Sequence, residues 1–301
     1  MKILVLGGSG FIGSALIRAL LDHGHQVRVF DRDVRSVSQQ FPQLMGVVQA
    51  DFSDVMSLTE AMIGVELVFH LISTSVPATS NKNPVFDIES NLVNTVRLLE
   101  SMRTADLKRI VYLSSGGTVY GNPVNLPISE SHTTNPTCSY GIVKLAIEKY
   151  LQMYAELYQL EVSILRPSNP YGPGQTHKGV QGFIGTCIDK INAGQPIHIW
   201  GDGSVVRDYV YIDDVVNACI LSMSSDYSGP INISSGEGFS LNQILGLLEQ
   251  YRGKSVDVVY QEKRSFDIPE VILDNSLAKS VLGWTPQIQI DHGLQMTLKS
   301  A

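Results

Sequence analysis

The chain has 301 residues and a formal net charge of −7, with 44% hydrophobic and 17% charged residues. This composition is typical of a globular protein, and the length allows one large or two modest domains. The negative balance gives no electrostatic reason to bind nucleic acid or an anionic membrane. We therefore expect any anionic ligand to be held by a local basic site.

Three cysteines, Cys138, Cys187 and Cys219, lie far apart and form no CxxC pair. We therefore expect neither a disulfide framework nor a bound metal. The first predicted strand begins at Lys2, which leaves no room for a signal peptide, and the apolar run over residues 65–72 is too short to span a bilayer. These features predict a cytoplasmic protein with no membrane partner.

A glycine-rich turn follows the first predicted strand, residues 2–6. Gly7, Gly10 and Gly13 are spaced by three residues, and an amphipathic helix begins at the turn. A strand, a glycine turn and a helix in this order present free backbone N–H groups to a phosphate at the positive helix terminus. Glycine alone also marks ordinary loops, so the spacing is only part of the argument.

The second predicted strand, residues 26–30, is followed by Asp31. An acidic residue about 20 positions after the glycines can accept hydrogen bonds from the ribose hydroxyls of an adenosine. The alternative is a helix cap or a solvated loop residue. Together with the glycine turn, Asp31 predicts a dinucleotide site, and its charge favours NAD over NADP because it repels a 2′-phosphate.

Further apolar strands are predicted over residues 46–51, 65–72 and 108–113, and a helix over 85–103. This alternation is typical of a doubly wound α/β fold, in which the strand ends meet at the edge that holds the glycine turn. Asp51 there could bind an adenine amino group, with Phe52 beside the ring, or it could simply precede a helix capped by Ser53 or Asp54. His70 is expected to be a satisfied core histidine.

Tyr140 and Lys144 open a predicted helix and, being four residues apart, lie on one face. A free phenol has a pKa near 10, about three units too high for a base at neutral pH. A neighbouring ammonium, together with a positive nicotinamide ring, stabilises the phenolate and lowers the pKa. The pair alone could also be a surface Tyr and Lys.

The ordered motifs resemble the extended short-chain dehydrogenase/reductases, in the NAD-dependent sugar epimerase/dehydratase group, and within it the UDP-hexose 4-epimerases. The resemblance runs nearly end to end. It rests on Gly7-Gly8-Ser9-Gly10-Phe11-Ile12-Gly13, Ser114-Ser115 with Val119-Tyr120-Gly121, Tyr140 to Lys144, Arg166 to Gly172, and Arg207 to Asp213.

The resemblance implies that Tyr140 is the acid/base on the sugar 4-hydroxyl, that Lys144 binds nicotinamide-ribose hydroxyls and lowers the tyrosine pKa, and that Asn91 orders the site. The family usually carries a catalytic Ser or Thr at the position of Gly116. We expect Thr118 to replace that hydroxyl, on the same side of an extended backbone, with Ser115 as second choice. The NAD contacts expected are Gly7, Gly10, Phe11, Ile12, Gly13, Asp31, Asp51, Phe52, Leu71, Ser73, Ser75, Tyr140, Lys144 and Ser168.

The resemblance also implies a nucleotide-sugar pocket. Asn169 would bind the nucleotide sugar, Arg207 and Arg264 the diphosphate, and Asp267 the uridine ribose. Trp200 could stack on the uracil or lie in the core. Val271 stands at the position that admits or excludes a 2-N-acetyl group, and its size leaves room for N-acetylhexosamines.

The expected fold is thus a doubly wound parallel Rossmann sheet with a smaller C-terminal substrate domain. Residues 1–168 and about 205–235 would form the NAD domain, and 169–204 with 236–301 the substrate domain. The expected activity is C4 epimerisation of a UDP-hexose (UDP-Glc/UDP-Gal or UDP-GlcNAc/UDP-GalNAc) through a 4-keto intermediate, by a homodimer paired through helices near 85–103 and 143–158. A uronate epimerase, a 4-ketoreductase and a catalytically silent NAD-binding regulator are the alternatives.

Overall fold

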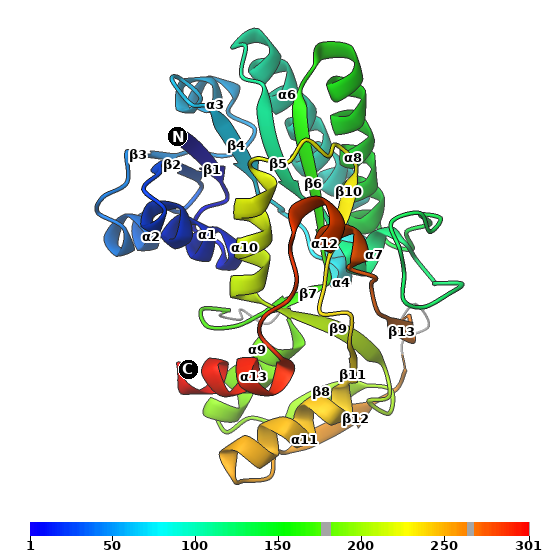
Figure 1. The fold of residues 1–301 in the computed structure, drawn as a ribbon. Helices are drawn as coiled ribbons and strands as arrows, with labels where there is room; N and C mark the ends of the chain where they lie inside the picture. The colour runs from blue at the N-terminus through cyan, green and yellow to red at the C-terminus, as the bar shows by residue number, and fades with distance from the viewer. Residues whose placement is uncertain (176–181, 264–267, 301) are drawn as a thin grey trace.

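The computed structural model describes residues 1–175, 182–263 and 268–300. Figure 1 shows the N-terminal part as a layered sheet with helices on both sides, and a smaller C-terminal part beneath it. None of the helices in the described ranges is long and apolar enough to cross a membrane.

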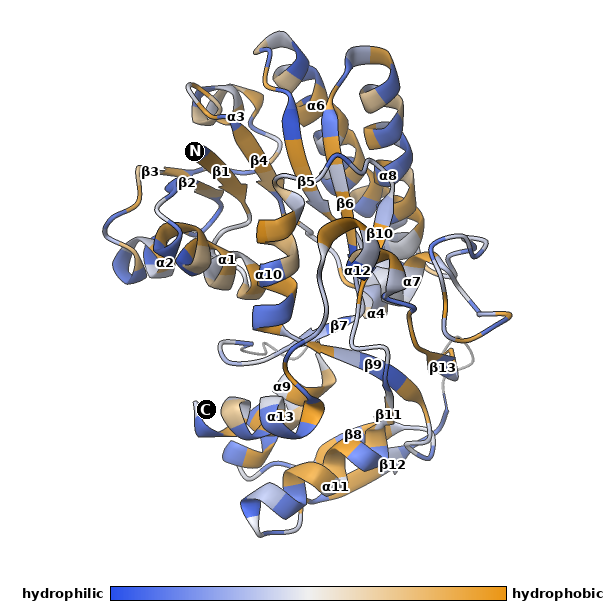
Figure 2. Ribbon diagram, in the orientation of Figure 1, coloured by the Kyte–Doolittle hydropathy of each residue, from blue (hydrophilic) through white to orange (hydrophobic). Residues whose placement is uncertain are grey.

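The large sheet has seven strands in the order β10-β6-β5-β4-β1-β2-β3, and all neighbours are parallel. This order confirms the doubly wound α/β prediction, because it reverses direction between β1 and β4. Figure 2 shows hydrophobic colouring along β1 and β4, as expected for strands that are covered on both faces. The strands are β1 (Lys2–Leu6), β2 (Gln26–Asp31), β3 (Gly46–Gln49), β4 (Leu67–His70), β5 (Arg109–Leu113), β6 (Glu161–Pro167) and β10 (Pro230–Ile233).

Alternate residues of β1 enter two different cores. Ile3 and Val5 pack with α1 (Phe11–Asp22), α2 (Arg35–Gln40) and α10 (Ile212–Ser222). Leu4 and Leu6 pack on the opposite face with α3 (Val55–Ala61), α6 (Asn94–Thr104) and α8 (Ser139–Tyr158). The sheet is therefore sandwiched between two helical layers, and only its edges are available for a site.

Two segments around the site differ from the sequence expectation. The region predicted as one helix over 85–103 is α5 (Pro84–Asp87), a π-helical turn η1 (Ile88–Val93) and then α6, and it is preceded by α4 (Pro77–Ser80). Residues 116–118 were expected to be extended but belong to the short helix α7 (Gly116–Val119). The geometric argument that placed Thr118 on the catalytic side is therefore wrong.

The smaller part is built on β9 (Val206–Tyr211), which pairs with β7 (Asn169–Tyr171), β11 (Gly238–Ser240) and β13 (Glu270–Val271). A separate pair joins β8 (Ile197–Trp200) to β12 (Val258–Gln261). The sequence predicts that the chain re-enters the NAD domain at about residue 205. In the structure β9 still belongs to the smaller sheet, and the chain re-enters the larger part with α10. The remaining helices are α9 (Phe183–Asn192), α11 (Leu241–Arg252), α12 (Ser276–Leu282) and α13 (Ile290–Lys299).

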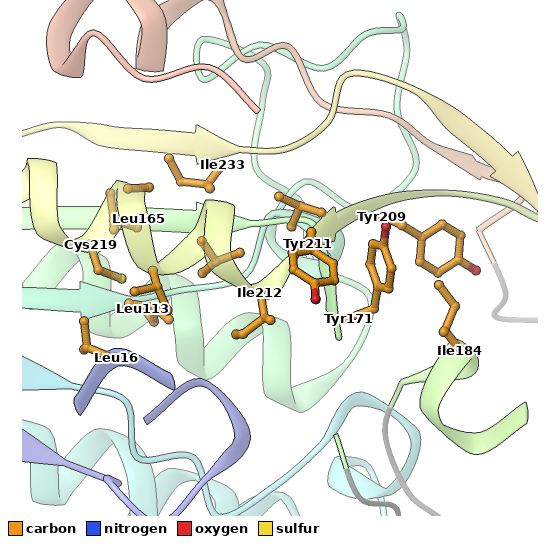
Figure 3. Packing of buried hydrophobic residues seen from close by; sticks show 14 of the residues in the cluster. Leu16, Leu113, Leu165, Tyr171, Ile184, Tyr209, Tyr211, Ile212, Cys219 and Ile233 are labelled. Atoms are coloured by element: carbon orange, nitrogen blue, oxygen red, sulfur yellow. The ribbon is translucent and has the colours of Figure 1, made fainter. Parts of the chain in front are cut away.

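One apolar cluster connects the two parts. Figure 3 shows it running from Leu16 and Leu165 through Ile212 to the tyrosines of β7 and β9. The ring of Tyr171 lies edge-on to that of Tyr211, with centroids 5.5 Å apart. Because residues of both parts are buried in this one cluster, apolar packing holds the smaller part against the carboxyl edge of the large sheet.

Candidate active site

The glycine turn after β1 is so tight that side chains are excluded from it. Gly7 has φ of 87°, and a Cβ added to Gly13 would lie 2.2 Å from the Gly7 carbonyl oxygen. Gly10 caps α1 without a side-chain hydrogen bond. The first-turn N–H groups of α1 are thus presented by backbone alone, which is the arrangement that binds phosphate.

A cavity of about 290 Å³ opens beside this turn. Asp31 is fixed at its rim, because one carboxylate oxygen accepts a hydrogen bond from the Ser9 N–H at 3.0 Å. Within the described residues the buried Ser9 hydroxyl has no partner. The lining brings together residues from the ends of several strands: Gly7, Ser9, Gly10, Asp31, Arg32, Asp33, Ala50, Asp51, Phe52, Leu71, Ile72, Ser73 and Thr74.

Asp51 and Phe52 have different roles in this lining. Asp54 caps α3 by accepting hydrogen bonds from two backbone N–H groups, so the predicted helix cap after Asp51 is confirmed and is Asp54, not Ser53. The Asp51 carboxylate accepts from the N–H and hydroxyl of Ser53, which lowers its pKa. The Phe52 ring packs in the core against His70, with centroids 5.1 Å apart. Asp51 therefore meets the cavity as an anion.

Tyr140 and Lys144 lie on the buried face of α8, with exposures of 7% and 6%. The Lys144 ammonium donates to the Leu113 carbonyl at 2.8 Å and lies 5.6 Å from the centre of the Tyr140 ring. Burial lowers the pKa of Lys144 to about 8 and raises that of Tyr140 to about 12. Desolvation dominates the pKa of Tyr140 in the protein without NAD, and the prediction that Lys144 and the nicotinamide ring together lower this pKa stays a prediction.

Two hydroxyls reach the Tyr140 phenol. The hydroxyls of Ser73 and Ser115 lie close enough to the phenol to act on its pKa, and both lower it. The Thr118 hydroxyl is buried without a hydrogen-bond partner among the described residues. At Gly116, an added Cβ would lie 2.3 Å from Leu273 Cδ1 and 2.9 Å from the Arg166 carbonyl oxygen, so a serine or threonine there would require both neighbours to shift. Ser115, and not Thr118, is thus the hydroxyl of this segment that lies beside Tyr140.

Asn91 occupies the π-helical turn η1 and is 5% exposed. Its carbonyl oxygen accepts from the Thr74 N–H at 2.9 Å, while its amide donates to the Thr74 hydroxyl and to Asp87. Single π-helical turns frequently occur at functional sites. The side chain that was expected to order the site therefore ties η1 to the loop after β4.

The other predicted cofactor residues are distributed around the same edge. Phe11 and Ile12 begin α1, and Leu71 lines the cavity. The Ser75 hydroxyl donates to Asp87 at 2.6 Å. The Ser168 hydroxyl donates to Asp208 at 3.0 Å.

The predicted substrate residues lie on the smaller sheet. The Asn169 amide donates to the Asp208 carbonyl at 2.7 Å, and Arg207 on β9 is in register with Val271 on β13. Val271 is 2% exposed and packs in an apolar cluster. Trp200 is 42% exposed, so the core alternative for this ring is wrong. Arg264 and Asp267 lie outside the described residues.

Three buried carboxylates of the site were not predicted. Asp87 contacts Ser75 and Asn91, Glu148 pairs with Arg166, and Asp208 contacts Ser168. One signal was present in the sequence, because Glu148 follows Lys144 by the same four residues that separate Lys144 from Tyr140. Asn91 likewise follows Asp87 by four residues, whereas Ser75, Ser168 and Asp208 meet their partners only in the folded chain.

These features define an α/β enzyme with a dinucleotide site and a Tyr-x-x-x-Lys pair at the carboxyl edge of its sheet. The excluded Cβ positions, the unpartnered Ser9 hydroxyl and the Asp31 carboxylate fit the phosphate and ribose groups of NAD. Residues 3–234 match the model of the NAD-dependent epimerase/dehydratase family, so the chain belongs to that family. NAD is its cofactor.

Two relatives align over nearly the whole chain. The UDP-glucose 4-epimerase of Mycolicibacterium smegmatis is 36% identical over 307 residues, covering 99% of this chain and 98% of the relative. The dTDP-4-dehydro-6-deoxyglucose reductase of Escherichia coli is 32% identical over 310 residues, covering 99% and 96%.

Two solved structures show the same fold. The UDP-glucose 4-epimerase of Thermotoga maritima with UDP-glucose superposes with a TM-score of 0.95 at 34% identity, covering 100% of this chain and 98% of that one. The UDP-glucuronic acid 4-epimerase of Bacillus cereus, with UDP-glucuronic acid and NAD, has a TM-score of 0.91 at 26% identity, covering 100% and 98%. Similarity therefore extends to enzymes with more than one sugar substrate.

Proposed function

We propose that this protein epimerises C4 of a UDP-hexose and uses NAD as a retained cofactor. The observation that carries the proposal is the buried Tyr140 phenol, whose pKa is lowered by the nearby hydroxyls of Ser115 and Ser73. Ser73 also lines the glycine-turn cavity. The resemblance of the chain to UDP-glucose 4-epimerases over nearly its full length supports the choice of reaction.

Tyr140 would move one proton, that of the sugar 4-hydroxyl. It takes the proton as C4 is oxidised and returns it to the same oxygen after the sugar has turned, so no proton is lost overall. Bound NAD would supply the oxidation and re-reduction of C4, together with a positive charge. That charge matters because the pKa of Tyr140 in the protein alone is about 12, well above neutral pH.

Lys144 and Ser115 would assist the same proton. Lys144 is held by the Leu113 carbonyl, and its pKa of about 8 keeps most of it charged at neutral pH. An ammonium over the phenol ring favours the phenolate electrostatically. Ser115 would donate its hydroxyl to the phenolate or to the sugar oxygen, in the role first expected for Thr118.

Arg207 would hold the diphosphate, with Asn169, Trp200 and Val271 around the nucleotide sugar. A planar guanidinium can pair with two phosphate oxygens, which would anchor the substrate while the sugar rotates. Arg264 and Asp267 are proposed as further contacts from the sequence pattern alone. Val271, which is paired in register with Arg207, is proposed as the residue that limits the 2-substituent.

A 4-ketoreductase is the second candidate, because a reductase is among the relatives of similar identity. A reductase would consume external reduced cofactor in proportion to product. An epimerase would equilibrate two sugars without net consumption. The similarity to a uronate 4-epimerase also makes UDP-glucuronic acid a substrate to be tested.

The test is product analysis by NMR after incubation with UDP-Glc, UDP-GlcNAc and UDP-GlcA, with bound NAD measured by mass analysis. We expect equilibration of one C4 pair without added cofactor, and loss of turnover in Tyr140→Phe. Retained NAD with no turnover of any sugar would instead indicate a catalytically silent protein. Activity that survives Tyr140→Phe would overturn the proposed chemistry.

We also propose a cytoplasmic homodimer paired through α8 and the 84–104 region. Five large hydrophobic side chains of α8 are exposed: Ile142 at 55%, Tyr150 at 38%, Met153 at 39%, Leu157 at 63% and Tyr158 at 40%. Val85 and Phe86 of α5 are exposed as well. The three cysteines are free, as a reducing compartment would keep them. Light scattering of wild type and Leu157→Glu tests the dimer, since a charge at this position should favour the monomer.

A further inference from the structure

Asp87, at the end of α5, is a buried carboxylate to which no role has yet been given. It is 1% exposed and accepts three hydrogen bonds. One oxygen accepts from the Ser75 hydroxyl at 2.6 Å and the Asn91 amide at 2.9 Å, and the other accepts from the Ser139 hydroxyl at 2.7 Å. Each donor comes from a different segment of the chain.

These three segments surround the Tyr140 phenol. Ser75 belongs to the loop after β4. In that loop the Ser73 hydroxyl donates to the Ser75 carbonyl at 3.1 Å and lies close enough to the Tyr140 phenol to act on its pKa. Asn91 lies in the π-helical turn and holds the Thr74 N–H of the same loop. Ser139 directly precedes Tyr140 and begins α8. Asp87 therefore connects the loop, the π-helical turn and the start of the catalytic helix.

The carboxylate is held by neutral donors. Across residues 1–175, 182–263 and 268–300, none of the ion pairs found includes Asp87. A buried charge is costly unless it is hydrogen-bonded, and here the two hydroxyls and one amide satisfy it. Its negative charge raises the pKa of both Tyr140 and Lys144.

We infer that Asp87 is a positioning residue of the active site: its carboxylate holds the loop of residues 73–75, Asn91 and the first turn of α8 in one arrangement around the Tyr140 phenol. This inference rests on the proposed function, because it assigns Asp87 to the same reaction. Proton transfer and near-attack geometry are sensitive to displacements of about 1 Å, which can cost on the order of 10²-fold in rate.

The principal test compares Asp87→Asn with a matched variant, Asp214→Asn. Asp214 is also buried, at 3%, but accepts from the N–H groups of Gln287 and Ile288, away from the catalytic pair. In Asp87→Asn the charge is lost and an amide N–H₂ replaces one acceptor. We expect kcat to fall by on the order of 10²-fold with a small change in KM, and Asp214→Asn to keep the wild-type kcat.

The pH dependence of kcat distinguishes a positioning and electrostatic role of Asp87 from a purely structural role. The titratable groups that act on the catalytic pair are Asp87, Glu148, Cys138, His70 and Tyr112. Removing the charge of Asp87 lowers the pKa of both Tyr140 and Lys144. Both limbs of the kcat profile should therefore move to lower pH in Asp87→Asn. Lower stability with unchanged kcat and profile would overturn the inference.

Hydrogen exchange gives a readout that does not depend on activity. Backbone amides of the first turn of α8 should exchange faster in Asp87→Asn than in wild type or Asp214→Asn. If wild type has no epimerase activity, the proposed function fails, and exchange still decides whether Asp87 holds this turn. Wild-type exchange in the variant would overturn the inference. If Asp87→Asn does not fold, Ser139→Ala, which removes one donor, replaces it in the kcat and exchange measurements.

Discussion

At the scale of single residues, the cofactor site depends on the absence of a side chain at Gly13 as well as on the polar groups of Ser9 and Asp31. Gly13 lies so close to the Gly7 carbonyl that the chain can make this turn only without a Cβ at that position. Ser9 and Asp31 then meet across the turn through a backbone N–H. The glycine spacing is therefore a steric requirement of the turn.

Gly13→Ala is expected to weaken NAD binding by at least about tenfold, because the new Cβ would displace the Gly7 carbonyl and with it the phosphate-binding turn. The measurement is NAD retained after purification, followed by titration. Gly246→Ala is the matched control, since that exposed helical glycine has no atom within 4 Å of its added Cβ. It should leave NAD binding unchanged and raise stability slightly.

His70 is buried in the neutral form. Thr95 donates its hydroxyl to the Asn91 carbonyl, so it accepts from His70 Nε2–H at 2.8 Å, and Nδ1 has no partner among the described residues. Burial and Lys144 lower the pKa of His70 to about 3. The unfolded chain therefore binds a proton near pH 6.5 that the folded chain does not bind until about pH 3.

The free energy of unfolding should consequently fall as pH falls from 6.5 to about 3. His70 contributes a slope of up to about 1.4 kcal/mol per pH unit. In His70→Gln the amide can still donate to Thr95, but the side chain does not titrate. The slope of the unfolding free energy against pH should therefore fall by up to about 1.4 kcal/mol per pH unit, which corresponds to one proton per molecule. Denaturant unfolding at several pH values measures it, and an unchanged slope would contradict the buried neutral histidine.

At the scale of elements, α8 carries Tyr140, Lys144 and Glu148 along one face. Glu148 is 1% exposed and pairs with Arg166 of β6, with contacts of 2.9 and 2.5 Å, and it also accepts from the Ser114 hydroxyl. The ion pair therefore fixes the helix to the strand next to the catalytic loop. It also supports the charge of Lys144, because Glu148 raises the lysine pKa.

Glu148→Gln is expected to destabilise the fold by about 3–5 kcal/mol, because it leaves the Arg166 guanidinium buried without its counter-charge. The alkaline limb of the pH–activity profile should also move to lower pH than in wild type, because the pKa of Lys144 falls when the charge of Glu148 is removed. Glu156→Gln, on an exposed position of the same helix, should change stability by less than about 0.5 kcal/mol. Similar effects of both variants would refute the role of the pair.

At the scale of the molecule, Asp208 joins the two sheets. It is 0% exposed on β9 and accepts from the hydroxyls of Ser168 and Ser235 and from the N–H groups of Ser235, Gly236 and Leu273. Ser168 follows β6, Ser235 follows β10 and Leu273 follows β13. One carboxylate thus connects the end of the large sheet to the strand that carries Arg207.

Asp208→Ala leaves these donors without an acceptor, and we expect a loss of more than about 3 kcal/mol in unfolding free energy. UDP-sugar affinity should fall more than NAD affinity, because Arg207 is the adjacent residue and the glycine turn is remote. Denaturation and separate titrations of NAD and UDP measure this. Asp202→Ala, in the exposed loop before β9, is the control and should change neither affinity.

Several features could be predicted from local patterns. The strand, glycine turn and helix at residues 2–22 and the common face of Tyr140 and Lys144 follow from the residue periods of strands and helices. The prediction for Thr118 was wrong because residues 116–119 form a helical turn and not an extended segment. The crowding of Gly116 by Leu273 could not be predicted either, because Leu273 is far away in the sequence. The rise of the Tyr140 pKa by burial in the protein without NAD could not be predicted from the sequence, because burial depends on packing.

The sequence by itself determined the fold class, the dinucleotide turn and the pair of residues proposed for catalysis, because each depends on contacts within a few residues or on a simple period. Only the tertiary structure decided which hydroxyl lies beside Tyr140, which carboxylates hold the site and how far burial shifts the pKa values. These depend on contacts between segments that are distant in the sequence, such as Asp87 with Ser139 and Glu148 with Arg166.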